Sequence, residues 1–158
     1  MNIRIGTGYD VHRLEAGRML VIGGLKIDSE VGAVGHSDAD VLIHAIIDAL
    51  LGAASLRDIG YHFPDTNDDY KGIDSKILLD RVVALLKENN WSIINIDSTV
   101  CLQSPKISKY IPEMQIVLSN ILQIDPDRLN IKATTTEKLG FIGREEGIAA
   151  QAVCLITK

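Results

Sequence analysis

The sequence has few aromatic residues and no excess of positive charge. Aromatics make up 4% of its 158 residues, and 21 acidic side chains outnumber 16 lysines and arginines, which gives a net charge of −5. A stacking platform for single-stranded nucleic acid needs aromatic rings, and a general nucleic-acid binder needs a basic face. We therefore expect no nucleic-acid partner. Any phosphate that the protein handles must meet positive charge from metal ions or helix N-termini.

Cysteines and long apolar runs are also scarce. Cys101 and Cys154 form no CxxC motif and lie in runs that read as strands, so we predict free, buried thiols in a reducing cytoplasm. No apolar run approaches the length that spans a bilayer, and Met1 leads into a strand-like segment rather than a charged and then apolar leader. These patterns predict an untargeted cytoplasmic protein with no membrane partner.

The pattern along the chain predicts one α+β domain over residues 1–158. An apolar fraction of 46% and a charged fraction of 23% are ordinary for a globular protein of this length. Strand patterns occupy residues 2–12, 91–102, 129–135 and 147–157, and residues 19–27 form a second strand or a hairpin arm. Helix patterns occupy residues 38–54, the segment that follows the N-cap Asp74, and the stripe 107–121, in which Pro112 kinks the helix or marks its start. Residues 58–73 form a long loop, and the helices are expected over one sheet face.

Two potential metal ligands stand at alternate positions in the first predicted strand. Asp10 and His12 are separated by one residue, and alternate side chains of an extended segment project from the same face. A carboxylate and an imidazole would then point together, as a metal pair requires. An ordinary surface pair is the alternative interpretation.

The first predicted helix carries a polar stripe. Asp40, His44 and Asp48 recur every four residues on an otherwise apolar helix, so this stripe must face something polar or charged. A solvent-exposed face is the alternative, but such faces usually carry Lys, Glu or Arg. We interpret His44 as a metal ligand, with the two aspartates holding its other nitrogen. Together with Asp10 and His12 it leaves a fourth position open, which favours catalytic zinc, with iron or manganese as alternatives.

Two further segments suit phosphate. In Gly35–Asp38, Ser37 or Asp38 can cap the first predicted helix, while free N–H groups at the same place attract an anion that His36 would orient. Segment 133–144 combines consecutive threonines with a carboxylate, glycines and an arginine, which suits phosphate oxygens and a hard cation. The alternative interpretation is a threonine-rich strand that runs into a turn, with a structural role only.

Taken together, the strings occur in an order that resembles one family. They are Asp10-Val11-His12, Gly35–Ala45, Asp58-Ile59-Gly60, Phe63–Thr66, Gln103–Lys106, Thr134–Phe141 and Gly143-Arg144. Over essentially its whole length the sequence resembles the 2-C-methyl-D-erythritol 2,4-cyclodiphosphate synthases of non-mevalonate isoprenoid biosynthesis. The resemblance implies a phosphorus–oxygen lyase that converts 4-diphosphocytidyl-2-C-methyl-D-erythritol 2-phosphate into the cyclic diphosphate and CMP. The substrate's 2-phosphate would attack its own β-phosphorus.

The resemblance also implies roles for individual residues. Zn²⁺ would be held by Asp10, His12 and His44, and Mg²⁺ or Mn²⁺ by Glu137. His36 and Thr135 would be catalytic. Ser37 would contact the methylerythritol phosphate end. Asp58, Ile59, Gly60 and the Phe63–Thr66 loop would contact the erythritol and ribose, and residues 102–108 with Thr134 the cytidine. The full implied set of substrate contacts is Ser37, Asp58, Ile59, Gly60, Phe63, Pro64, Asp65, Thr66, Leu102, Gln103, Ser104, Pro105, Lys106, Ile107, Ser108, Thr134, Thr136, Phe141 and Arg144.

The implied fold is a single-domain α+β sandwich of ferredoxin-like topology, with one mixed sheet and about three helices on one face. Family members are homotrimers with active sites between subunits. Arg144 matches the gate of a cavity on the threefold axis that accepts isoprenoid diphosphates in the family. Glu145 stands where the family pattern usually has a smaller residue, often glycine, so we expect weaker anion binding there.

The residues alone leave two other functions open. A zinc-dependent phosphohydrolase would use the same ligands with water as the nucleophile, and Asp40 or Asp48 would serve as its base. A non-catalytic trimeric scaffold with structural zinc would need four protein ligands, so His36 or His62 would have to join the set. We interpret His62 as an ordinary loop histidine.

Overall fold

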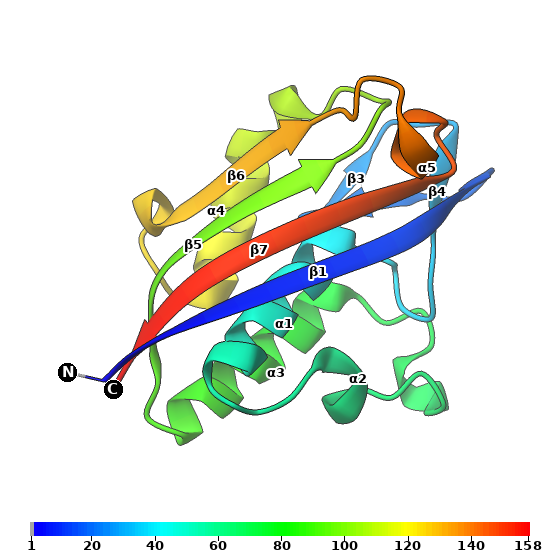
Figure 1. The fold of residues 1–158 in the computed structure, drawn as a ribbon. Coiled ribbons are helices and arrows are strands. Elements are labelled where there is room, and N and C mark those ends of the chain that lie inside the picture. The colour runs from blue at the N-terminus through cyan, green and yellow to red at the C-terminus, as the bar shows by residue number, and fades with distance from the viewer. Residues whose placement is uncertain (1) are drawn as a thin grey trace.

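A five-stranded mixed β-sheet forms one layer of the molecule (Figure 1). The computed structural model describes residues 2–158. The strand order is β4-β1-β7-β5-β6, and neighbours are antiparallel except for β5 and β6. The strands are β1 Ile3–Ala16, β4 Val31–Val34, β5 Ser92–Cys101, β6 Leu129–Thr134 and β7 Gly147–Thr157. Because β1 and β7 pair along almost their whole length, the two chain ends lie side by side.

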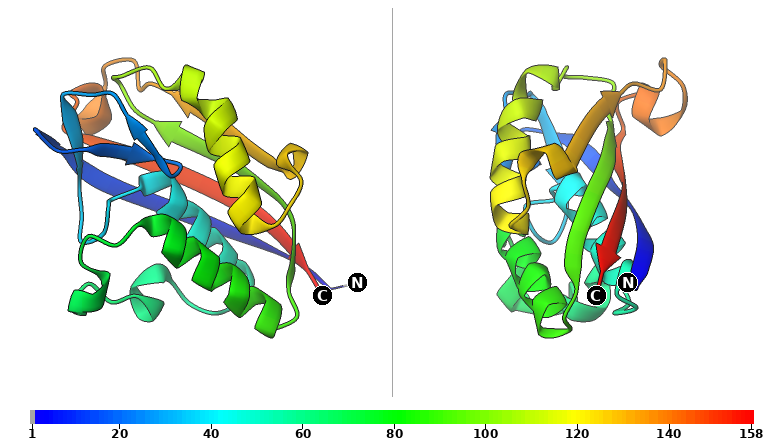
Figure 2. Two further views of the ribbon diagram at one scale, coloured as in Figure 1. Left: turned by 180° about the vertical axis from the view of Figure 1, so that it is seen from behind. Right: turned by 90° about the vertical axis from the view of Figure 1, so that its left-hand side faces the viewer.

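Three long helices cover one face of this sheet (Figure 2). They are α1 Val41–Ala53, α3 Ser75–Glu88 and α4 Ile111–Leu122. A hairpin of β2 (Leu20–Ile22) and β3 (Leu25–Ile27) lies on the same side as the helices. The shorter turns are α2 Ile59–His62, α5 Gly140–Gly143, η1 Asp68–Tyr70, η2 Ser108–Tyr110 and η3 Pro126–Arg128. Turns α2 and η1 lie inside the segment predicted as a long loop.

Helix α1 is the centre of the core. Every residue of the helix except Asp48 and Gly52 is buried, because α1 lies between strands β1 and β7 on one side and α3 on the other. Fully burying a Leu or Ile side chain stabilises the fold by about 1.5–3 kcal/mol, so this helix contributes strongly to holding the layers together. A chemical group on α1 therefore sits on a rigid support.

Most predicted elements are confirmed, with changes at their ends. Strand β7 has the predicted bounds, and α3 begins after Asp74, whose side chain accepts a hydrogen bond from the N–H of Lys76. Pro112 lies in the first turn of α4, where its missing N–H costs nothing, so it marks the start of that helix rather than a kink. The 19–27 segment forms the β2–β3 hairpin.

The predicted start of the first helix is wrong by three residues. Ala39 has a positive φ of 58°, which is not helical, and Asp40 is the N-cap of α1. The Asp40 side chain accepts from the N–H of Ile43, as N-cap side chains do. Neither Ser37 nor Asp38 caps the helix, so these two polar groups are available for other contacts.

The ferredoxin-like topology is wrong for the second half of the sheet. A ferredoxin-like fold has the order β-α-β-β-α-β with split βαβ units. Strand β7 does lie between β1 and β5 and splits that first unit, but β5, α4 and β6 form a direct unit whose strands are parallel neighbours. The α+β class, the mixed sheet and the helices on one face are confirmed.

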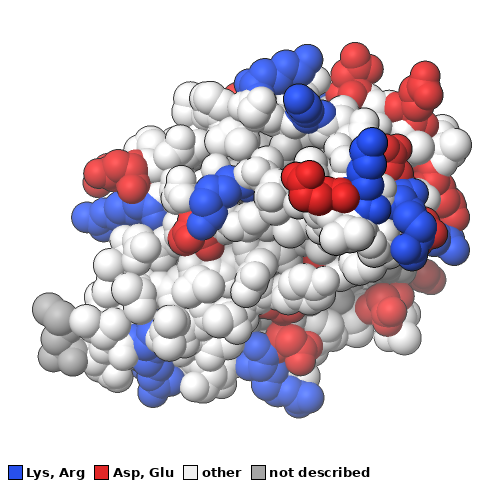
Figure 3. Space-filling model, turned by 45° about the horizontal axis from the view of Figure 1, so that its top comes forward, with Lys and Arg blue, Asp and Glu red and all other residues white. Residues whose placement is uncertain are grey.

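The sheet face opposite the helices carries exposed apolar side chains along β1. Ile3, Ile5 and Tyr9 project from this face and are 50%, 65% and 61% exposed. Figure 3 shows a broad uncharged area with charges of both signs interspersed around it. Within residues 2–158, no helix combines the length and apolar character needed to cross a membrane.

Candidate metal and phosphate site

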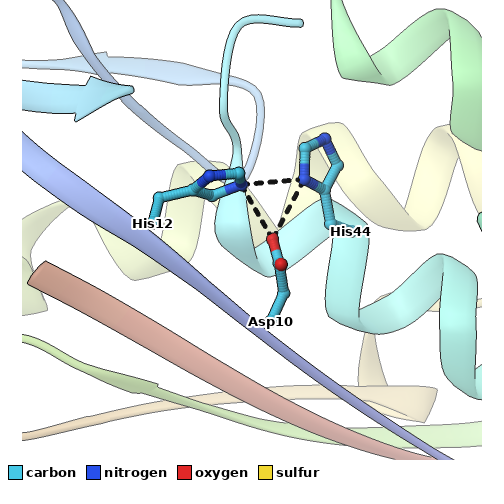
Figure 4. A group of neighbouring side chains, drawn as sticks. All are labelled: Asp10, His12 and His44. Carbon is cyan, nitrogen blue, oxygen red and sulfur yellow. Dashed lines mark hydrogen bonds and ion pairs between the residues drawn. The ribbon is translucent and has the colours of Figure 1, made fainter. Parts of the chain in front are cut away.

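Three side chains from β1 and α1 converge on one point (Figure 4). Oδ2 of Asp10 lies 2.8 Å from Nε2 of His12 and 3.0 Å from Nδ1 of His44, and the two ring nitrogens are 3.1 Å apart. A tetrahedral metal ion with bonds of about 2.0–2.1 Å separates its ligand atoms by roughly 3.3 Å. These three atoms are therefore arranged as ligands of one cation, and small outward movements would admit the ion.

The strand and the helix each contribute to this convergence. Asp10 and His12 occupy alternate positions of β1, so both project towards the helical layer, as predicted. His44 lies on the first turn of α1 and projects back towards β1. The prediction that these three residues form one group is confirmed by their geometry.

The second ring nitrogen of His12 is fixed by the backbone. Nδ1 of His12 lies 3.0 Å from the carbonyl oxygen of Val34, at the end of β4. A carbonyl only accepts hydrogen bonds, so Nδ1 carries the proton and donates it. Nε2 of His12 is then the nitrogen that faces Asp10, and its lone pair would bind a metal ion there.

The carboxyl of Asp10 and the imidazole of His12 shift each other's pKa. Burial raises the pKa of the Asp10 carboxyl, but hydrogen bonds and charge from His12 and His44 outweigh burial and hold that pKa well below its usual range. Burial lowers the pKa of His12, but the hydrogen bond and the charge of Asp10 outweigh it, and the pKa is raised. The pocket therefore favours a negative carboxylate beside positive charge, which either protons or a metal ion can supply.

The predicted roles of Asp40 and Asp48 as partners of His44 are wrong. Asp40 is fully buried and accepts from the backbone N–H groups of Gly23, Gly24 and Ile43, so it joins the β2–β3 turn to the start of α1. Asp48 accepts from the N–H of Ile59, 2.8 Å away. Burial raises the pKa of both carboxyls, which their backbone hydrogen bonds partly offset. Both aspartates are structural.

Ser75 takes the role that sequence reasoning gave to the aspartates. Its Oγ lies 2.9 Å from Nε2 of His44, and the Oγ of Ser37 lies 3.1 Å from the same nitrogen. Ser75 is completely buried at the start of α3. Nothing in its sequence context pairs it with a histidine 31 positions earlier, so only the packing of α3 against α1 reveals it.

A cavity of about 330 Å³ opens beside the metal ligands. His12 and His44 line it together with six of the predicted site residues, namely His36, Ser37, Ile59, Gly60, Phe63 and Asp65. Tyr70 and Leu78 also line this cavity and were not predicted. Nε2 of His36 lies 3.1 Å from the carbonyl oxygen of Asn67, which ties the ring to the 63–72 segment. Asp58 is the N-cap of α2 and accepts from the N–H of Tyr61.

A second cavity of about 210 Å³ lies at the end of β5 and β6. Its lining includes most of the predicted cytidine contacts, together with Ala133 and the predicted catalytic residue Thr135. The cytidine contacts are Leu102, Gln103, Pro105, Lys106, Ile107, Ser108 and Thr134. The side chain of Gln103 accepts from the N–H of Lys138, 3.2 Å away, and so connects this cavity to the loop that follows β6.

That loop carries the predicted second cation ligand. Glu137 is exposed and accepts from the hydroxyl of Thr135 over 3.3 Å, while its own N–H donates to the same hydroxyl oxygen over 3.3 Å. Glu137 and Lys138 have positive φ values of 53° and 64°, a backbone cost that tight loops at binding sites often carry. The hydroxyl of Thr136 donates to the carbonyl of Leu139.

The two cavities have no lining residue in common. His36 lines the first cavity and Thr135 the second, so this chain alone does not bring the predicted catalytic pair into one cavity. Among the residues that the structure describes, the only group of three or more potential ligands is Asp10, His12 and His44. Neither alternative fourth ligand joins the group: His62 faces the carbonyl of Leu56 at 2.7 Å, and His36 faces the carbonyl of Asn67 at 3.1 Å.

Arg144 is paired within its own turn. Its guanidinium donates to both carboxylate oxygens of Glu146, at 2.9 and 3.0 Å. This bidentate pair raises the pKa of Arg144 and lowers that of Glu146. Glu145, which sequence reasoning placed against Arg144, has a positive φ of 59°. An anion at Arg144 would therefore compete first with Glu146.

The chain matches a known protein family over almost its whole length. The family model described as "YgbB family" matches residues 3–157. The 2-C-methyl-D-erythritol 2,4-cyclodiphosphate synthase of Phocaeicola vulgatus is 59% identical over 158 residues, which is 100% of this chain and 99% of the relative. The homologue of Bacteroides fragilis with the same name is 58% identical over the same share of both chains.

Solved structures agree with this match. The bifunctional IspDF of Campylobacter jejuni superposes with a TM-score of 0.94 at 43% identity, covering 98% of this chain and 42% of that longer chain. The CDP complex of IspF from Plasmodium falciparum superposes with a TM-score of 0.86 at 37% identity, covering 98% of this chain and 96% of that chain.

Proposed function

This chain belongs to the YgbB family, and from that premise we propose that it converts 4-diphosphocytidyl-2-C-methyl-D-erythritol 2-phosphate into 2-C-methyl-D-erythritol 2,4-cyclodiphosphate and CMP. An oxygen of the 2-phosphate attacks the β-phosphorus, the bond from that phosphorus to the oxygen bridging to the α-phosphate breaks, and CMP leaves with that oxygen. The observation that carries the proposal is the group Asp10, His12 and His44 at a cavity that His36 and Ser37 also line.

We assign Asp10, His12 and His44 to Zn²⁺, and Glu137 to Mg²⁺ or Mn²⁺. Two imidazoles and one carboxylate fit zinc and leave one coordination position open, which is typical of a catalytic rather than a structural site. When bound, these ions supply the positive field that polarises phosphate and that a chain of net charge −5 otherwise lacks.

The protein's own task is to fold a flexible polyanion into an in-line geometry. We assign Ser37 and His36, which line the metal cavity, to the 2-phosphate end, and Asp58, Ile59, Gly60 and the Phe63–Thr66 loop to the erythritol and ribose. Such positioning lowers the barrier because it removes rotational freedom before the reaction begins. Thr135 is placed beside Glu137, where a hydroxyl donor would stabilise charge on the reacting phosphate.

The second cavity is the proposed cytidine subsite. Its walls come from segment 102–108 and from Ala133, Thr134 and Thr135, and Lys106 adds a positive charge near it. A structural relative superposing over 98% of this chain is described as a CDP complex, which supports a cytidine nucleotide as the ligand class. Thr136, Phe141 and Arg144 follow in the same loop region and remain predicted substrate contacts.

We further propose that the active unit is a homotrimer, located in the cytoplasm, with sites between subunits. The metal cavity and the nucleotide cavity are separate in one chain, and one substrate must span both. The exposed apolar side chains of Ile3, Ile5 and Tyr9 on the open sheet face give a second copy a surface to cover. Analytical ultracentrifugation at several concentrations tests this part of the proposal, and a monomer with full activity would contradict it.

Phosphorus NMR of the reaction tests the activity itself. The purified protein is mixed with the cytidylated substrate, zinc and magnesium, and the products are followed over time. We expect CMP together with two mutually coupled cyclic-diphosphate resonances, both abolished in His44→Ala. The control variant His62→Ala removes a histidine outside the metal group, and it should retain the activity.

The other two functions predict different spectra. CMP with an open-chain bisphosphate would show that water is the nucleophile and that the protein is a zinc-dependent phosphohydrolase. If a trimer that holds stoichiometric zinc shows no turnover, the protein is a non-catalytic scaffold. The scaffold is disfavoured because the described residues offer three ligands in the group rather than the four of a closed structural site.

A further inference from the structure

The hydrogen bonds behind His44 lead away from the metal site to a buried serine and an aspartate. Nε2 of His44 lies 2.9 Å from Oγ of Ser75, and that hydroxyl lies 2.5 Å from Oδ1 of Asp38. The backbone N–H of Ser75 also donates to Oδ2 of Asp38 over 3.0 Å. Ser75 is 0% exposed, so water does not compete for its hydroxyl.

The direction of these bonds follows from the number of protons available. Oδ1 of Asp38 also accepts from the N–H of Asp40, so both carboxylate oxygens face donors and serve as acceptors. The Ser75 hydroxyl has one proton, which it donates to Asp38. Its oxygen must then accept from His44, and the proton of the His44 ring therefore lies on Nε2.

The direction of these hydrogen bonds determines which nitrogen of His44 is available to a metal ion. A neutral imidazole with its proton on Nε2 has its lone pair on Nδ1. Nδ1 is the atom of His44 that faces Asp10 and His12. The backbone carbonyl of Val34 fixes His12 in the same sense, with Nε2 free. Each imidazole therefore has its outer nitrogen fixed as a donor, to Ser75 or to Val34, and turns its other nitrogen towards Asp10, where a divalent ion would replace the hydrogen-bonded protons.

We propose that Ser75 and Asp38 form a positioning pair that holds His44 in its Nε2–H tautomer and so presents Nδ1 to a divalent metal. This inference rests on the metal assignment of the proposed function. Hydrogen bonds to the far nitrogen of a metal-binding histidine orient the ring and raise its basicity, and losing them typically weakens metal binding 10–100-fold.

Ser37 does not have the same role, although its Oγ lies 3.1 Å from Nε2 of His44. Its hydroxyl oxygen accepts from the N–H of Ala39 over 3.3 Å, and no carboxylate fixes the direction of its proton. Ser37 also lines the metal cavity, whereas Ser75 is sealed from it. The Ser37 proton is therefore free to turn towards a phosphate oxygen, and the Ser75 proton is not.

Two measurements on the full chain test the pair. Long-range proton–nitrogen NMR of the metal-free wild type reports which ring nitrogens of His44 carry a proton. We expect the Nε2–H form for His44 in the wild type and a mixture of both forms in Ser75→Ala. Competition with a chromophoric chelator then gives zinc affinity, and we expect Ser75→Ala to bind about 10–100-fold more weakly.

Matched controls separate positioning from folding. Ser98 is another buried serine, whose hydroxyl donates to the carbonyl of Asn130 on the sheet, and Ser98→Ala should leave both the tautomer and the zinc affinity unchanged. Ser37→Ala should leave the tautomer unchanged. The Nδ1–H form in the wild type, or equal zinc affinity in Ser75→Ala and Ser98→Ala, would overturn the inference. If the wild type binds no zinc, the metal assignment is wrong instead. The tautomer of His44 would then still test the role of Ser75 and Asp38.

Discussion

Gly8 of β1 lies so close to Ala45 of α1 that a Cβ at position 8 would stand 1.9 Å from the carbonyl oxygen of Ala45. Gly6, two residues earlier on the same face, would place a Cβ 2.0 Å from the carbonyl of Ala49. The two glycines let α1 pack directly against the backbone of β1. Because His44 is the residue before Ala45, this close approach also sets the distance from His44 to Asp10.

We expect Gly8→Ala to damage both stability and the metal site. The added methyl group meets backbone atoms that cannot turn away, so α1 must move off the strand, at a cost of about 1–3 kcal/mol or more. Urea unfolding measures the loss of stability, and chelator competition the loss of zinc affinity. The matched control is Gly52→Ala on α1, where the nearest atom is 3.9 Å away, and it should be neutral or stabilise by about 0.5–1 kcal/mol. Equal stability of Gly8→Ala and Gly52→Ala would contradict the packing argument.

Zinc should stabilise the folded protein through Asp10, His12 and His44. A ligand that binds only the native state at a hundred times its Kd adds about 2.7 kcal/mol to the free energy of unfolding. The midpoint temperature of thermal unfolding should therefore rise in the presence of excess zinc, and a chelator should reverse this rise. His44→Ala should show no zinc-dependent shift, while His62→Ala should behave as wild type because His62 faces the carbonyl of Leu56. A shift that persists in His44→Ala would place the zinc elsewhere.

The sequence predicted the metal group because its signal is local. The spacing of Asp10 and His12 fixes their common face in any strand, and the apolar surroundings of His44 require a buried helix. The partners of His44 were mispredicted for the opposite reason. Neighbours at four-residue spacing lie on the same helical stripe, but Asp40 and Asp48 are held by backbone N–H groups from other segments.

Long-range packing also explains the remaining differences between the prediction and the structure. Ser75 meets His44 only because α3 packs against α1, and no sequence period encodes that contact. The direct β5–α4–β6 unit follows the same element pattern as a split unit would, so the order of elements alone does not determine which strand lies beside β5. The residue strings of the family identified both cavities, but the chain gives no local signal for how they face one another.

Glu145→Gly should stabilise the protein. Glu145 has a φ of 59°, and a left-handed conformation costs a residue with a side chain about 1–2 kcal/mol. Glycine removes that cost but adds roughly 0.4–1 kcal/mol of unfolded-state entropy, so a net gain of about 0.5–1 kcal/mol is expected. A higher urea midpoint at an unchanged slope is the readout. Glu146→Gly is the control and should not stabilise, because it removes the carboxylate that pairs with Arg144.

The two cysteines should react slowly while the protein is folded. Burial raises the pKa of the Cys154 thiol to about 12, and burial also raises that of Cys101. At about pH 8 roughly one Cys154 in ten thousand is then a thiolate, which is the reactive form. Mass spectrometry after iodoacetamide treatment should show little modification of native Cys154, faster modification of the half-buried Cys101, and rapid modification of both in denaturing urea. Cys154→Ser identifies the slower site. Native Cys154 that reacts as fast as it does in urea would show that β7 opens readily, against its central position in the sheet.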